Sequence, residues 1–359
     1  MAAMSDGWKW TIARCMRTPS SRLRLLFLCT ALALLPVIVV LRLQLLKPAA
    51  LLLTSSPSIS SSVTSSFGTL PAAKPFYASE DTADTSVEET NKSSTVRLPD
   101  VLLIGVRKAG TRALLDALKL HPLIRCARRE VHFFDDDERF GRGVAWYARQ
   151  LPTAGSQQVL LEKTPAYFTA PAAPARVLSV LPEARFIVIL REPVTRAISD
   201  FTQVYYNRLE LNKTLPVFEE LALKRNGSEP ADFYIDSSYK PVRNSLYAEH
   251  LARWLRLFPL HRFLFVDGDS FRVQPLPQLR LVEAFLGLPP LISPEQLIYN
   301  HDKGFFCFRR SREARARCLG SSKGRPHRPI HPEIVARLHR LIEPYNRRFF
   351  NLTNRVFDW

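Results

Sequence analysis

Acidic residues are scarce in this chain of 359 residues, where 33 Asp and Glu stand against 50 Lys and Arg. The formal net charge of +17 points to a polyanionic partner, and nucleic acid, an anionic membrane surface and a sulfated glycan all fit it. The charge alone does not choose between these partners. Because 46% of the residues are hydrophobic, the composition supports a large buried core and excludes a disordered protein.

Long apolar runs are equally scarce, and the one that is present lies near the N-terminus. Residues 25–41 carry no charge, which is the short end of a membrane span, and the run reaches residue 46 if Arg42 snorkels to the interface. Basic residues before the run place the N-terminus in the cytosol. We predict a cytosolic tail over 1–24 and a transmembrane signal anchor over 25–46. A cleaved signal peptide is the alternative, although no clear small-residue cleavage site follows closely.

Large apolar residues are few in the next segment, 47–97, which is rich in Ser, Thr, Pro and Ala and is typical of a disordered stem. From residue 98 to 359 the composition is that of one lumenal domain without internal repeats. Short apolar runs there predict strands at Val101–Val106, Val159–Leu161, Phe186–Leu190 and Phe263–Val266. Helical patterns cover Thr111–Leu120, Pro174–Leu181, Pro193–Tyr206, Leu246–Leu257 and Leu279–Leu286. This alternation favours an α/β fold with a mainly parallel central sheet flanked by helices, whose ligands gather beyond the carboxyl ends of the strands.

A phosphate cradle is indicated where the first strand leads into a helix. Residues 101–112 read VLLIGVRKAGTR, a buried strand followed by a turn of small residues and a helix start. Backbone N–H groups and the helix dipole favour an anion there, and Lys108 adds a mobile positive charge. The motif is not a Walker A motif, because the lysine precedes the glycine. Taken alone, the motif is also compatible with an ordinary tight connection between a strand and a helix.

Charged residues follow three more of these segments. Arg191 ends a strand and Ser199 lies two turns further along the next helix, a pair that suits phosphate oxygens, although a surface salt bridge and a helical serine fit equally. In EVHFFD, Glu130 and His132 share one face if the segment is extended, which suggests a general base. A metal site is the competitor, but the cluster lacks zinc-ligand spacing. Lys163, in EKTPAY, lies at the same sheet edge or is a solvated surface lysine.

With these motifs in one order, the chain resembles the heparan sulfate glucosamine 3-O-sulfotransferases. The similarity covers residues 98–359. It rests on GVRKAGTRALL, EVHFFD, EKTPAYF, LREPVTRAISDFTQV, HLARWLRLFP, KGFFC, SKGRPH and the terminal FDW. The resemblance implies a P-loop-like sulfotransferase fold that moves a sulfuryl group from 3′-phosphoadenosine 5′-phosphosulfate (PAPS) to the 3-hydroxyl of glucosamine in heparan sulfate or heparin.

The resemblance also assigns the donor site. The first turn would hold the 5′-phosphosulfate, Arg191 and Ser199 the 3′-phosphate, and a basic loop at 323–327 would close over the nucleotide, although a solvated charge run is the other interpretation of that loop. The implied donor residues are Lys108, Ala109, Gly110, Thr111, Arg112, Arg191, Ser199, Lys323, Gly324, Arg325, Pro326 and His327.

In the family's chemistry, Glu130 corresponds to the general base that takes the proton of the attacking hydroxyl. Lys108, Lys163 and His132 would offset charge on the sulfuryl oxygens and the leaving phosphate, and Asp135 would orient its neighbours, with no metal required. The acceptor cleft would comprise Arg107, Glu130, Val131, His132, Phe133, Phe134, Asp135, Asp136, Lys163, Thr164, Pro165, Ala166 and Gln203.

The resemblance further implies a disulfide between Cys307 and Cys318, which an oxidising lumen allows, and leaves Cys126 over as a buried thiol. Two positions depart from the family pattern. Ala109 stands where relatives usually carry a second glycine, so weaker donor binding is the most we expect from it. Arg128 and Arg129 make the approach to Glu130 unusually basic, in a region that helps to set acceptor preference.

The layout predicts a single-pass type II protein of the Golgi membrane with its catalytic domain in the lumen. That location disfavours nucleic acid as the polyanionic partner. Two other functions stay open: a Golgi glycan sulfotransferase with a different acceptor position, and an inactive glycan-binding homologue.

Overall fold

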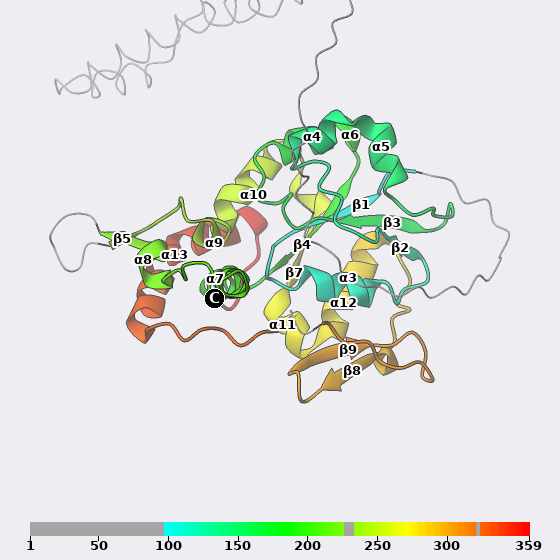
Figure 1. Ribbon diagram of the computed structural model, residues 1–359. Coiled ribbons are helices and arrows are strands. Elements are labelled where there is room, and N and C mark those ends of the chain that lie inside the picture. Colours follow the sequence, from blue (N-terminus) through cyan, green and yellow to red (C-terminus); the bar gives the residue numbers. More distant parts are fainter. Residues whose placement is uncertain (1–96, 226–232, 321–323) are drawn as a thin grey trace, which may run out of the picture. The chain divides into compact units, whose positions relative to one another are not determined.

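The computed structural model describes residues 97–225, 233–320 and 324–359 (Figure 1). The predicted tail and anchor, and the stem up to residue 96, lie outside the described residues. Within the described ranges, no helix is long and apolar enough to span a bilayer.

A five-stranded parallel sheet forms the centre of the fold, in the order β2-β3-β1-β4-β7. Its strands are β1 (Val101–Gly105), β2 (Ile124–Cys126), β3 (Val159–Lys163), β4 (Arg185–Leu190) and β7 (Phe263–Asp267). The four strands predicted from apolar runs are all present, and the expectation of an α/β fold with a parallel sheet is confirmed. Strand β2 was not predicted, because it is three residues long and carries an exposed Arg125 at its centre.

Helices flank this sheet (Figure 1), and all five predicted helices are present. They are α3 (Thr111–Leu118), α4 (Asp137–Gly141), α5 (Gly143–Arg149), α6 (Ala173–Val180), α7 (Pro193–Glu210), α8 (Phe218–Ala222), α9 (Lys240–Arg243), α10 (Tyr247–Leu255), α11 (Gly268–Val273), α12 (Pro275–Leu286) and α13 (Pro332–Thr353), with 3-10 turns at Leu260–Arg262 and Pro294–Gln296. Helix α7 begins at Pro193 because the preceding residues cap it. The side chain of Glu192 accepts hydrogen bonds from the backbone N–H groups of Val194 and Thr195, and proline is favoured in the first turn.

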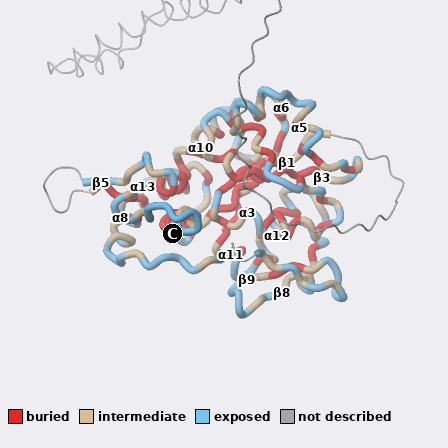
Figure 2. Tube along the Cα trace, in the orientation of Figure 1, coloured by how far each residue is buried: buried red, intermediate tan, exposed pale blue. Residues whose placement is uncertain are grey.

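The apolar runs are buried on both faces of the sheet, as covered parallel strands require (Figure 2). Val101–Ile104 in β1 are 0% exposed. A second apolar cluster lies between α7, α8 and α13 and includes Phe201, Phe218 and Leu338.

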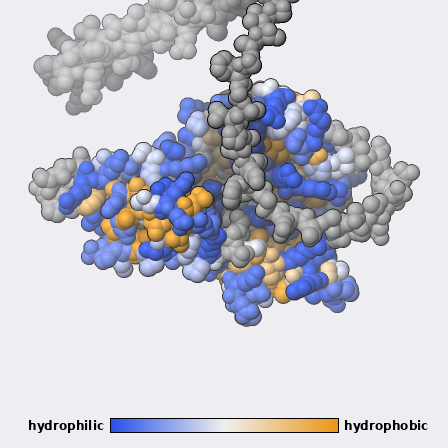
Figure 3. Space-filling model, in the orientation of Figure 1, coloured by the Kyte–Doolittle hydropathy of each residue, from blue (hydrophilic) through white to orange (hydrophobic). Residues whose placement is uncertain are grey.

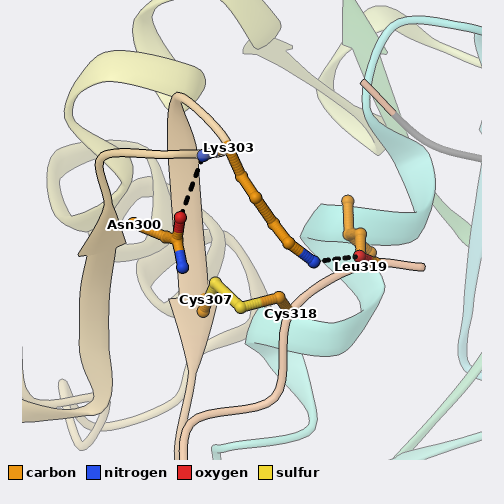
Figure 4. The surroundings of a disulfide bond; sticks show 5 residues. All are labelled: Asn300, Lys303, Cys307, Cys318 and Leu319. Carbon is orange, nitrogen blue, oxygen red and sulfur yellow. Dashed lines mark hydrogen bonds between the residues drawn. A yellow bond between two sulfur atoms is a disulfide. The ribbon is translucent and has the colours of Figure 1, made fainter. Parts of the chain in front are cut away.

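Two small antiparallel pairs complete the fold: β5 (Leu223–Arg225) with β6 (Phe233–Ile235), and β8 (Leu297–Asn300) with β9 (Phe305–Phe308). The predicted disulfide joins Cys307 in β9 to Cys318, beside the side chain of Lys303, which donates to the carbonyl of Leu319 (Figure 4). Cys126 is free and only half-buried, but burial raises the pKa of its thiol to about 12, so the thiol is inert at neutral pH.

Candidate active site

Cationic side chains come together at one edge of the sheet. Arg107 and Lys108 follow β1, Lys163 ends β3 and Arg191 follows β4, and these three strands are neighbours in the sheet. Because all the strands are parallel, their carboxyl ends meet at that edge, where α/β proteins bind ligands.

The turn between β1 and α3 has an unusual backbone. Lys108 and Gly110 have positive φ values of 71° and 112°. Gly268, the first residue of α11, approaches the turn so closely that a Cβ atom there would lie 2.5 Å from the carbonyl oxygens of Ala109 and Leu190. The turn is thus held against the sheet by a contact that only glycine permits.

A pocket with a volume of about 170 Å³ opens over this turn. Lys108, Ala109, Gly110, Arg191 and Gly324, all predicted donor residues, line it. Sequence reasoning missed most of the opposite wall, which is formed by Phe271, Arg272, Phe305, Phe306, Phe308 and Leu319. The KGFFC motif is the signal in the sequence that points to Phe305 and Phe306. The pocket combines cations with aromatic rings, as a nucleotide with several phosphates requires.

Of the predicted donor residues that the structure describes, six do not line this pocket, and three of these six lie on α3 and α7. Arg112 lies on α3 and pairs with Asp116 on the same helix, at 2.9 Å. Thr111 is buried in the first turn of α3, and Ser199 is half-buried on α7. Their donor roles remain predictions.

The segment after residue 323 lies beside the pocket. Partial burial, and then the charges of Arg191, Lys108 and Arg272, lower the pKa of His327. Pro326, next to it, is exposed. Lys323 lies outside the described residues.

Arg325, in the same segment, contacts α7. Its guanidinium lies 3.4 Å from the carboxylate of Glu210 and 5.2 Å from the ring centre of Tyr206. This contact connects the segment beside the pocket to the helix that carries Ser199 and Gln203.

A second cluster centres on Glu130. Its carboxylate forms an ion pair with Lys163, and its other oxygen lies 3.5 Å from Nε2 of His132. Nδ1 of His132 lies 2.9 Å from Asp135, so the imidazole bridges two carboxylates. The side chain of Lys163 is only 6% exposed, which excludes a solvated surface lysine, whereas that of Glu130 is 40% exposed.

These contacts move both pKa values. Burial alone would raise the pKa of Glu130, but the hydrogen bond from His132 and the charge of Lys163 lower it to about 2. Hydrogen bonds to Asp135 and then to Glu130 raise the pKa of His132 to about 9. At neutral pH the cluster therefore holds an ionised glutamate between two cations.

The condition under which alternation would put Glu130 and His132 on one face, an extended segment, is not met. These residues lie in no strand, and His132 has a positive φ of 55°. The two side chains still face each other, but the cause is this local turn and the contacts of the imidazole, not the alternation of a strand.

The predicted acceptor residues divide into two groups. Arg107 is half-exposed and its Nε lies 2.7 Å from Asp200 on α7, and Gln203 lies 3.5 Å from Nζ of Lys108. Ala166 is half-buried, and Asp136 accepts the N–H of Arg139 and thereby caps α4. The residues of the other group are buried, and their acceptor roles remain predictions: Val131, Phe133, Phe134, Thr164 and Pro165.

No group of three or more metal-ligating side chains with suitable geometry occurs in the described part of the chain. The predicted cluster at 130–135 instead binds its own cations, Lys163 and His132.

Known proteins are similar to this chain over most of the described residues. A family described as "Sulfotransferase domain" matches residues 98–349. The human heparan sulfate glucosamine 3-O-sulfotransferase 5 is 44% identical over 263 residues, which is 73% of this chain and 74% of that protein. The human 3-O-sulfotransferase 6 is 43% identical, with the same coverage of each chain. A crystal structure of a sulfotransferase from Alicyclobacillus acidocaldarius superposes with a TM-score of 0.53 at 20% identity, over 73% of this chain and 98% of that one, and shares the fold.

Proposed function

The chain belongs to the sulfotransferase domain family and, within it, to the heparan sulfate glucosamine 3-O-sulfotransferases, and we propose that it transfers a sulfuryl group from PAPS to the 3-hydroxyl of glucosamine in heparan sulfate. The observation that supports this most directly is the meeting of Glu130 with Lys163 and His132 at the sheet edge that also carries Lys108 and Arg191. A base for the hydroxyl and cations for the phosphosulfate are thus on one edge.

The pocket residues fit the nucleotide donor. Lys108, Arg191 and Arg272 offer positive charge, and Phe305 and Phe306 offer apolar surface for a base. The donor, when bound, supplies the sulfuryl group. The protein's part is to hold its phosphates with fixed cations, which stabilise developing charge without reorganisation.

Glu130 is proposed to take the proton of the acceptor hydroxyl. Its exposed carboxylate is ionised, but a pKa of about 2 makes it a weak base while Lys163 and His132 both hold it. Proton transfer becomes easier if Lys163 turns its ammonium toward the charge that develops on the sulfuryl group, because the carboxylate then loses a positive neighbour. Lys163 would thereby couple removal of the hydroxyl proton to transfer of the sulfuryl group.

His132 is proposed to stay protonated, with Asp135 as its anchor. A pKa of about 9 keeps the imidazole charged at neutral pH. The ring then offers an N–H donor and a positive charge beside Glu130. On the acceptor side, Arg107 and Gln203 would meet the sulfates and carboxylates of the sugar chain.

The test is to incubate the protein with PAPS and structurally defined heparan sulfate oligosaccharides and to map the position of the added sulfate. Sulfate on the 3-oxygen of glucosamine is the expected product. Sulfate on another oxygen or on nitrogen would identify a sulfotransferase of different acceptor position. Binding of the oligosaccharide without transfer would identify an inactive glycan-binding homologue.

We further propose that the protein is a type II protein of the Golgi membrane. The uncharged run at 25–41 with its basic flank supports an anchor, and the Cys307–Cys318 disulfide supports an oxidising lumen. Protease protection of a C-terminal epitope in sealed Golgi vesicles tests the topology. Digestion of that epitope without detergent would contradict it.

A further inference from the structure

The backbone that carries Glu130 has no strand or helix partner, so its N–H groups must be satisfied by other means. Three successive N–H groups, those of residues 131–133, donate to side chains of one other segment, the end of β3 and the turn after it. The bonds run from Val131 to Glu162 Oε1 at 3.4 Å, from His132 to Thr164 Oγ1 at 3.4 Å, and from Phe133 to the Tyr167 hydroxyl at 3.0 Å.

The three accepting side chains form a buried unit. Glu162, Thr164 and Tyr167 are each 0% exposed, so none of them faces a ligand. The Thr164 hydroxyl donates to Glu162 Oε1 at 2.6 Å, which links two of the three acceptors to each other. A buried hydrogen-bond network of this kind has one preferred geometry, because breaking any bond leaves a polar group unpaired.

The same short segment also supplies the cation of the site. Lys163 lies between Glu162 and Thr164 in the chain, and its ammonium pairs with the Glu130 carboxylate. The backbone positions of the base and of the cation are therefore set by one stretch of chain, which carries the lysine and binds the backbone next to Glu130. Arg139 adds to this from the other side by donating to the carbonyl of Val131 at 2.7 Å.

We propose that Glu162, Thr164 and Tyr167 are positioning residues that hold Glu130 and His132 in the geometry needed for proton transfer. The inference rests on the proposed role of Glu130 as the base. Thr164 is the central member, because its hydroxyl accepts from His132 and donates to Glu162. The role proposed here concerns its buried side chain, and its assignment to the acceptor cleft stays a prediction.

The first test is Thr164→Val, which removes the hydroxyl and keeps the volume. The expected result is a fall in kcat of about 10- to 100-fold, because a small misplacement of the reacting groups has that effect. The KM values for PAPS and for the oligosaccharide should stay within about twofold, because Thr164 touches neither. Thr164→Ser keeps the hydroxyl and should recover most of the loss. Tyr167→Phe removes the hydroxyl that accepts from the N–H of Phe133 and provides a second variant if Thr164→Val folds poorly.

The matched control is Thr353→Val. Thr353 is also a buried threonine whose hydroxyl donates to a backbone carbonyl, that of Phe349 at 3.0 Å, but it lies in α13. The Thr353→Val variant should be less stable than the unmodified protein but should have the same kcat. An equal loss of kcat in Thr164→Val and Thr353→Val would show that the effect is general loosening of the fold, and it would overturn the inference.

The decisive comparison uses Glu130→Gln as the background. If Thr164 acts through Glu130, adding Thr164→Val to Glu130→Gln lowers kcat little further, because the base that it positions is already gone. An equal fold-decrease in kcat from Thr164→Val in the unmodified protein and in Glu130→Gln would overturn the proposal. Failure of the proposed function is distinct from this, because it would show in the unmodified protein as the lack of any 3-O-sulfated product.

Discussion

At the scale of single residues, burial decides which partner of the central ion pair meets the substrate. Lys163 is almost fully buried, and a buried ammonium is stable only next to a carboxylate. Glu130 is the exposed member of the pair and can reach an acceptor hydroxyl. The lysine is therefore the supporting charge and the glutamate the reacting group.

The first prediction concerns the protonation of His132. Its pKa of about 9 lies above the ordinary 6.5, so the stabilisation from its charged form is complete below pH 6.5 and is lost as pH rises through about 9. Asp135→Asn removes the larger cause and should bring the titration down toward 6.5. NMR titration of the ring, assigned with a His132→Asn spectrum, measures both values. A His132 signal that titrates near 6.5 in the unmodified protein would refute this account of the site.

Residue-level prediction from sequence was reliable where a motif sets chemistry and weak where packing sets exposure. Glu130, His132, Asp135 and Lys163 do come together. The sequence did not show that Thr164 is buried behind them, because the side chain of a threonine at a strand end can face either the core or the solvent.

At the scale of elements, the site depends on the contacts between the segments that follow the sheet strands. The helix α11 begins with Gly268 directly against the turn after β1 and the end of β4. This contact connects the two strand ends that carry Lys108 and Arg191. The geometry of the donor pocket should therefore respond to a methyl group at position 268.

The second prediction is that Gly268→Ala weakens donor binding. The new Cβ would meet two carbonyl oxygens at 2.5 Å, so the turn or the helix must shift, which also lowers stability by ~1–3 kcal/mol. We expect affinity for adenosine 3′,5′-bisphosphate to fall by about tenfold, equivalent to ~1.4 kcal/mol, in isothermal titration calorimetry. Gly141→Ala, where a methyl group meets no atom within 4 Å, is the control and should bind normally. Equal affinities in the two variants would rule out this role for Gly268.

Helices and strands could be predicted where the pattern of apolar and polar residues is clear. The four buried strands were identified because their short runs are apolar throughout, and the five helices because their apolar positions recur at helical spacing. The 22-residue helix α13 was missed although Leu338, Ile342 and Phe349 lie on its buried face, because its many arginines and the internal Pro344 obscure the pattern. The pair β8 and β9, whose strands have mixed exposure, was not predicted.

At the scale of the whole molecule, excess positive charge is the dominant property. The net charge is +17, and the face in Figure 3 is mostly hydrophilic, with apolar residues gathered over part of the lobe that holds α7 and α8. A sulfated polysaccharide would be attracted to such a protein over distances comparable to the Debye length, about 10 Å at 0.1 M salt.

The third prediction is that acceptor binding depends on salt and that donor binding depends on it less. Raising the salt concentration from about 0.05 to 0.3 M should weaken heparan sulfate binding by about tenfold or more, because ionic contacts with a polyanion release counterions. The donor lies in a pocket, where screening is smaller. Surface plasmon resonance at a series of salt concentrations measures the slope, and a flat response of heparan sulfate would count against a basic cleft.

The central claim is that Glu130 is the base, and the most direct measurement is the single-turnover rate of sulfate transfer by Glu130→Gln. The account predicts a fall of about 100- to 10,000-fold, or roughly 3 to 5 kcal/mol of barrier, with donor affinity and melting temperature close to those of the unmodified protein. A near-normal rate in the folded variant would contradict it, because sulfuryl transfer would then proceed without the carboxylate at position 130.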